Sequence, residues 1–163
     1  GIETTLQALE TLPQKLSLLV VAGRNERLLQ RVRAAAASSH HLVKVWGYTE
    51  KAQMLMKASD LLITKPGALT ISESFVLGLP ALLHDPIPGP ETENAVYATR
   101  NGAAIWLHPG EKLASAVAEL LENGCLSAMG ERAAACGRPE AAGDIAREIV
   151  RFMQTVPVSG GKV

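Results

Sequence analysis

The stretch that most constrains the fold is residues 60–102, which holds two strand–loop–helix units in immediate succession. The apolar run at residues 61–64 is followed by Lys-Pro-Gly at residues 65–67, and apolar residues at helical spacing then lead to Gly78. A second apolar run, residues 81–83, ends in a proline-rich loop before another helix opens. Two such units in succession predict parallel strands. Sheets of this kind bind their ligands beyond the carboxyl ends of the strands. Both loops lie at that edge.

The first of these loops has the chemistry of a phosphate site. Gly67 lets the backbone approach a ligand, and the amides of Ala68, Leu69 and Thr70 open a helix whose dipole favours negative charge. Glu73, one turn later, could accept hydrogen bonds from two vicinal sugar hydroxyls, as acidic residues do for ribose. In the alternative interpretation, Thr70 and Glu73 form a Thr-x-x-Glu capping box, and this spacing alone favours the cap.

The second loop offers polar groups that suit a sugar. Its prolines stiffen the connection after residues 81–83, and Glu91, Glu93 and Asn94 follow at the helix start. Carboxylates and an amide match sugar hydroxyls. Helix capping and dipole complementarity by the two acids explain the same residues, and for this loop alone they are the simpler interpretation.

Three further apolar runs predict strands at residues 16–22, 42–46 and 103–107. The first of them, with paired valines, is typical of a strand buried on both faces. With the two central strands they predict an α/β fold, a Rossmann-like parallel sheet of five strands with helices on both faces. Helices are expected over residues 2–11, 26–37, 50–58, 111–122, 126–135 and 140–153, and a Gly/Ser/Lys-rich tail over residues 157–163.

The loop after residues 16–22 also points toward the expected ligand edge. Arg24 could reach a diphosphate there and Asn25 another polar group. An arginine in such a loop is more often simply solvated.

Composition excludes several classes of function. The 163 residues are 47% hydrophobic and 20% charged, which fits one globular domain, and 16 basic residues balance 16 acidic ones, so nothing argues for nucleic acid binding. Cys125 and Cys136 indicate neither a disulfide framework nor a zinc site and fit a reduced, cytoplasmic protein. The four histidines suggest no metal-ligand pair, so we predict no metal site and no catalytic base. No apolar run is long enough for a membrane helix, and no signal peptide is evident.

The loop sequences together resemble the carboxy-terminal, donor-binding half of family 28 glycosyltransferases, which have the two-domain GT-B architecture. The likeness is greatest to diacylglycerol glucosyltransferases and monogalactosyldiacylglycerol synthases, and more distant to the enzyme that adds N-acetylglucosamine to lipid I. It extends over nearly all of the chain. The residues that carry it are TKPGALTISE at 64–73, GLP at 78–80, DPIPGPETEN at 85–94, NGA at 101–103, AGRNE at 22–26, VKVWGY at 43–48 and RPE at 138–140.

This resemblance implies a hexosyltransferase that uses a uridine diphosphate sugar as donor, with no cofactor and no metal. It implies that Gly67, Ala68, Leu69 and Thr70 hold the diphosphate and that Glu73 takes the ribose hydroxyls. The uracil would lie by Tyr48 and Thr49, and the transferred sugar by Glu91, Glu93 and Asn94. Ala68 and Pro90 depart from the lipid class, whose members often carry Gly and Gln there.

The implied partners are the donor, a lipid acceptor such as diacylglycerol, and a membrane surface at its inner, cytoplasmic face. The resemblance assigns the acceptor site and the catalytic base to an amino-terminal domain. We expect residues 1–156 to be the donor domain without its first, central strand and glycine-rich loop, of which Gly1 would be the last remnant. We therefore expect this chain alone to bind nucleotide weakly and to catalyse no transfer. Two alternatives remain open at this point, an N-acetylglucosaminyltransferase of the peptidoglycan type and a non-catalytic subunit of a split glycosyltransferase.

Overall fold

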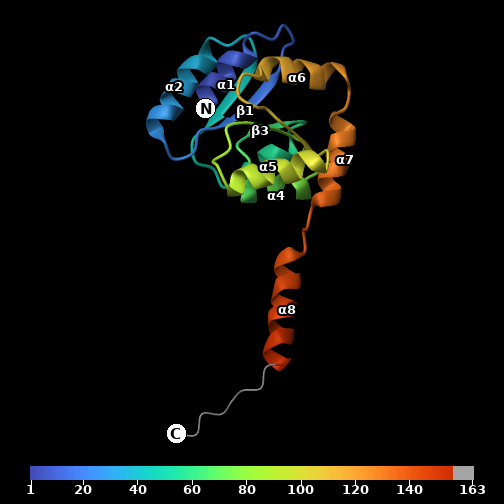
Figure 1. The fold of residues 1–163 in the computed structure, drawn as a ribbon. Coiled ribbons are helices and arrows are strands. Elements are labelled where there is room, and N and C mark those ends of the chain that lie inside the picture. Colours follow the sequence, from blue (N-terminus) through green and yellow to red (C-terminus); the bar gives the residue numbers. More distant parts are fainter. Residues whose placement is uncertain (156–163) are drawn as a thin grey trace.

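The computed structural model describes residues 1–155 and consists there of alternating helices and parallel strands (Figure 1). The elements in chain order are α1 (Ile2–Leu9), β1 (Ser17–Val21), α2 (Glu26–Ala37), β2 (Leu42–Trp46), α3 (Ala52–Lys57), β3 (Leu62–Thr64), α4 (Ala68–Val76), β4 (Ala81–Leu83), α5 (Pro90–Arg100), β5 (Ala104–Trp106), α6 (Leu113–Glu122), α7 (Leu126–Cys136) and α8 (Ala141–Thr155). The expected α/β class with parallel strands is confirmed.

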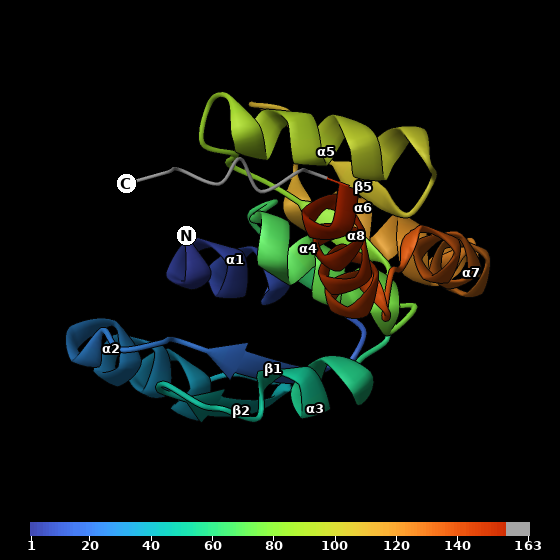
Figure 2. The ribbon, with the colours of Figure 1, turned by 90° about the horizontal axis from the view of Figure 1, so that it is seen from below.

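The strands form two sheets, however, and not the single five-stranded sheet that we expected. β1 pairs with β2, and β3, β4 and β5 form a second sheet in that order, with no pairing between the two sheets among residues 1–155. Figure 2 shows β1 and β2 as a separate layer below α1 and α4. The prediction that β1 is buried on both faces is also wrong, because β1 lies at an edge and leaves Val21 37% exposed.

The core is built around β4, the middle strand of the larger sheet. Its residues Ala81, Leu82 and Leu83 are fully buried. Because side chains alternate along a strand, Leu82 packs with Leu9 and Leu120 on one face, while Leu83 packs with Ile71, Phe75, Ala95 and Ala98 on the other. Helices therefore cover both faces of this sheet, as expected, and they fix the carboxyl ends of β3 and β4.

The carboxy-terminal helices differ in their packing. α7 packs against α4, whereas α8 extends away from the other elements (Figure 1). No helix among residues 1–155 combines the length and apolar character needed to cross a membrane. The expected tail at residues 157–163 lies outside the described residues.

Candidate functional site

The loop between β3 and α4 presents open amides. α4 is capped by Gly67 without a side-chain hydrogen bond, and the amide of Ile71 donates to the Gly67 carbonyl oxygen at 3.0 Å. The amides of Ala68, Leu69 and Thr70 therefore precede the first intrahelical hydrogen bond. Leu69 is 82% exposed, so this helix start is accessible. It is the geometry that an anionic group needs.

The capping-box interpretation of Thr70 and Glu73 is wrong. Thr70 is the third residue of α4 and not its cap. Glu73 accepts a hydrogen bond at 3.0 Å from the side-chain amide of Gln53 in α3, where a capping box would turn it back toward the start of its own helix. Its carboxylate is thus held at the surface between α3 and α4.

The loop between β4 and α5 is tied to this helix start. Asn94 donates from Nδ2 to the carbonyl oxygen of Pro66 at 2.9 Å, which joins α5 to the loop before α4. Glu91 accepts from the amide of Ile87 at 2.7 Å and so closes its own loop. α5 is capped by Gly89 without a side-chain bond, so neither acid caps it. Glu93 is exposed and borders a hollow of about 360 Å³.

The loops of the smaller sheet meet each other as well. The guanidinium of Arg24 lies 4.4 Å from the ring centroid of Tyr48, so these two residues from separate loops form one exposed contact. Asn25 caps α2 by accepting from the amide of Leu28 at 3.0 Å. Thr49 accepts from the amide of Lys51 at 3.1 Å. The side-chain oxygens of Asn25 and Thr49 are therefore used locally.

Gln53 contacts a predicted site residue, Glu73, and the sequence analysis did not single it out. It joins α3, which follows the smaller sheet, to α4 of the larger sheet. A glutamine in the first turn of a short helix carries no signal by itself, because its partner is 20 residues away in sequence.

A second feature missed from the sequence is the pair His84 and Asp85 at the end of β4. Nδ1 of His84 lies 3.1 Å from Oδ2 of Asp85, and this hydrogen bond holds the pKa of Asp85 below its ordinary value. Both residues line a hollow of about 790 Å³ beside α1 and the end of β5. Thr70 and Glu73 do not line it. The other residues predicted for donor binding do not line it either.

Folding also brings together three residues of metal-ligating type that the sequence spacing does not group. The ligand atoms of Glu10, His40 and His41 lie within 4.8 Å of one another. They belong to the segments after α1 and before β2, away from the loops described above. The sequence concealed this group because 30 residues separate Glu10 from His40.

Comparison with known proteins finds glycosyltransferases. The family described as "Glycosyltransferase family 28 C-terminal domain" matches residues 2–147. The chain is 34% identical over 151 residues to a "Processive diacylglycerol beta-glucosyltransferase" of Bacillus cereus (strain 03BB102), covering 92% of this chain and 39% of that protein. It is 33% identical over 158 residues to the protein of the same name from Bacillus thuringiensis (strain Al Hakam), covering 96% and 40%. The chain thus spans about two fifths of the length of these relatives.

Solved structures share the fold. The structure of Acinetobacter baumannii MurG superposes with a TM-score of 0.75 at 22% identity, covering 94% of this chain and 45% of that one. The spinosyn rhamnosyltransferase SpnG superposes with a TM-score of 0.66 at 17% identity, covering 94% and 40%. At these identities the likeness concerns the fold alone.

Proposed function

The chain belongs to the family 28 glycosyltransferases, as their C-terminal domain, and we propose from this that it binds the nucleotide-sugar donor of a hexosyltransferase. The donor is a uridine diphosphate sugar, and the whole protein transfers its hexose to a lipid. The observation that carries the proposal is the family match over residues 2–147, because that range contains every loop of the candidate site.

The diphosphate binds at the start of α4 in this proposal. The open amides of Ala68, Leu69 and Thr70, the Thr70 hydroxyl and the positive end of the helix dipole all favour an anion there. These groups stabilise the departing diphosphate as the bond to the sugar breaks, which is electrostatic catalysis without a covalent step. The proposal includes no metal and no cofactor.

Glu73 takes the ribose hydroxyls. Its contact with Gln53 orients one carboxylate oxygen, which leaves the other free to accept from a hydroxyl. The contact of Arg24 with Tyr48 supplies a flat cationic surface beside the uracil and the diphosphate. The side chains of Thr49 and Asn25 each hold their own loop through one hydrogen bond. They contact the nucleotide through the hydrogen-bonding groups that this bond leaves free.

The transferred sugar lies by the start of α5. Glu93 is exposed and able to accept hydrogen bonds, and Asn94 keeps a side-chain oxygen free because only its Nδ2 is used to bind Pro66. Glu91 closes the loop through Ile87 and supports the site without reaching the sugar.

The acceptor is diacylglycerol, as in the proteins named processive diacylglycerol beta-glucosyltransferase. The acceptor site and the catalytic base lie in a part of the protein outside this chain, which works at the inner face of a membrane. The resemblance to MurG concerns the fold and does not favour transfer of N-acetylglucosamine. Product analysis of the whole protein with diacylglycerol and with lipid I as acceptors distinguishes the two.

The donor site is tested by titrating this chain with uridine diphosphate while following its amide chemical shifts. We expect weak binding, with shifts clustered at Tyr48, at residues 67–73 and at residues 91–94. The Glu73→Ala variant loses charge-assisted hydrogen bonds, so its affinity should fall by about tenfold or more. Glu131→Ala, an exposed glutamate of α7, is the matched control and should bind as the parent does. Equal affinity of the parent and Glu73→Ala would refute the assignment of Glu73.

A further inference from the structure

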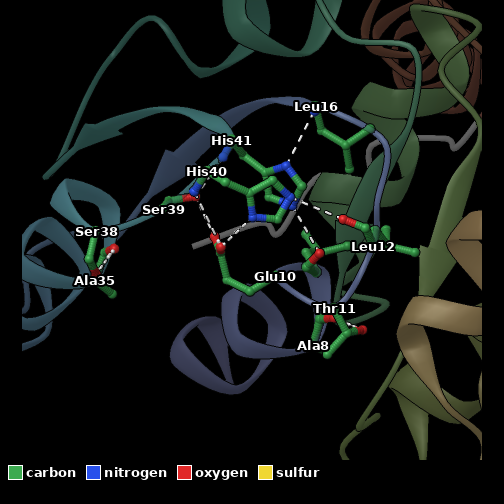
Figure 3. Close-up of polar contacts among 11 residues, drawn as sticks. Ala8, Glu10, Thr11, Leu12, Leu16, Ala35, Ser38, Ser39, His40 and His41 are labelled. Atoms are coloured by element: carbon green, nitrogen blue, oxygen red, sulfur yellow. Dashed lines mark hydrogen bonds and ion pairs between the residues drawn. The ribbon is translucent and has the colours of Figure 1, made fainter.

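The cluster of Glu10, His40 and His41 joins the end of α1 to the segment that leads into β2 (Figure 3). The two carboxylate oxygens of Glu10 face different partners. One accepts from the hydroxyl of Ser39, and the other lies 2.9 Å from Nδ1 of His40. Ser39 and His40 therefore both contact the Glu10 carboxylate. The amide of His41 donates to Ser39 Oγ at 3.0 Å, which adds the third residue before β2 to the cluster.

Both ring nitrogens of His40 face oxygen acceptors. Nδ1 faces the Glu10 carboxylate, and Nε2 lies 3.0 Å from the carbonyl oxygen of Leu12. A neutral imidazole carries only one N–H, so it can satisfy only one of these acceptors. The doubly protonated ring satisfies both. The hydrogen bond from Ser39, followed by that from His40, holds the pKa of Glu10 below its ordinary value, which keeps the carboxylate ionised and able to accept.

His41 has the opposite arrangement. Its Nδ1 accepts from the amide of Leu16 at 3.3 Å, and its Nε2 lies 2.9 Å from the carbonyl oxygen of Leu9. One nitrogen must therefore be an acceptor and the other a donor, which defines the neutral ring with its proton on Nε2. The side chain is buried, and its ring centroid lies 3.9 Å from that of His40.

We propose that His40 and His41 hold opposite charge states and form, with Glu10, a proton-dependent clasp that fixes the end of α1 to the β1–β2 unit. The charged ring of His40 links Glu10 to the Leu12 carbonyl, and the neutral ring of His41 links the carbonyl of Leu9 to the amide of Leu16. Both rings come from the segment before β2, and both contact the backbone at the end of α1 or in the connection between α1 and β1. This matters because the two sheets share no strand pairing among residues 1–155.

The same contacts argue against a metal ion. Both nitrogens of His41 and both nitrogens of His40 are already engaged, three of the four with backbone groups. A metal would have to break at least one backbone hydrogen bond of the buried His41 ring to gain it as a ligand.

The clasp has two pH limits. As pH falls, Glu10 becomes protonated and loses an acceptor, and as pH rises, His40 loses one of its two N–H donors. The titratable side chains in contact with His40 are Glu10 and His41. A separate ion pair joins α1 to α2, from Arg31 to Glu3 at 2.9 Å, and it contains no histidine.

The charge states are read directly from the imidazole ¹⁵N shifts of this chain, recorded across a pH titration. At a pH where His40 is charged we expect two protonated nitrogens for His40 and one protonated nitrogen, Nε2, for His41. Glu10→Gln removes the carboxylate that faces Nδ1 of His40, so the ¹⁵N shifts of His40 at that pH should change, while those of His108 should not. His108 lies outside the clasp and is the internal control. Ring ¹⁵N shifts of His40 that are the same in both proteins would overturn the proposal.

The mechanical role is tested by urea unfolding. Glu10→Gln and His40→Asn should each lower the unfolding midpoint, and the double variant should lose less than the sum, because both changes remove the same contact. Strictly additive losses would overturn the coupling. Stoichiometric Zn²⁺ should leave both rings unchanged, and shifts of both rings with loss of the His41 Nε2 proton would identify a metal site in place of a clasp.

Discussion

At the scale of single residues, Asp85 combines backbone strain with an ionic contact. Its φ of 46° is the only positive value at a non-glycine position among residues 1–155. The side chain is 64% exposed and lies 3.1 Å from Nδ1 of His84. Left-handed backbone is unfavourable for most residues, and strain of this kind gathers at functional sites. The position of Asp85 at the end of β4 and beside the proposed sugar site fits that pattern.

Two substitutions separate the strain from the charge. Asparagine tolerates the left-handed backbone but carries no charge. The parent should lose stability as pH falls through the lowered pKa of Asp85, and Asp85→Asn should lack this pH-dependent part of the free energy of unfolding. Above the ordinary pKa of 3.8 the parent should be more stable than this variant, by at most about 1 kcal/mol because the pair is exposed. Asp85→Gly also relieves the strain and should exceed Asp85→Asn in stability by about 1 kcal/mol. Urea unfolding at several pH values measures both effects, and a parent-like pH dependence in Asp85→Asn would contradict the first.

At the scale of elements, α7 and the end of α4 approach closely through glycine. A Cβ on Gly130 would lie 2.8 Å from the carbonyl oxygen of Gly78, which is backbone and cannot easily move. Gly130→Ala should therefore destabilise the protein by about 1–3 kcal/mol through overpacking. Gly143 in α8 is the matched control, because a Cβ there meets only the mobile end of Arg147 at 3.3 Å. Gly143→Ala should be neutral or stabilising by up to about 1 kcal/mol through helix propensity. Thermal unfolding that ranks the two variants in the reverse order would refute the steric argument.

The elements themselves were largely predictable, because local signals define them. The sequence predicted α2, β2 and β4 to the residue, from helical spacing of apolar residues and from short apolar runs. The side-chain contacts of the site were not predictable. The Thr70 to Glu73 spacing by itself favours a cap, and only the contact with Gln53 shows where the carboxylate lies. Contacts that join distant segments leave no periodic pattern in one sequence.

At the scale of the whole molecule, the division into two sheets is the largest departure from the sequence prediction. β1 and β3 each have one edge without a strand partner among residues 1–155. The family resemblance predicts one further central strand. We propose that a parallel strand from a segment outside residues 1–155 pairs with both free edges and completes one continuous sheet. The 37% exposure of Val21 fits a strand edge that such a partner would cover.

The alternation of backbone groups along a strand identifies which amides would report this pairing. Ala22 donates to Trp46 at 2.8 Å and Leu62 donates to Pro80 at 2.9 Å, so the amides of Val21 and Ile63 point toward the free edges. In this chain those two amides should exchange with solvent faster than the amides of Ala22 and Leu62, since no partner protects them. In a longer protein that contains the amino-terminal part, Val21 and Ile63 should become as protected as their neighbours. Protection of Val21 and Ile63 already in this chain would show that the free edges have another partner, and the proposed central strand would then have no place to pair.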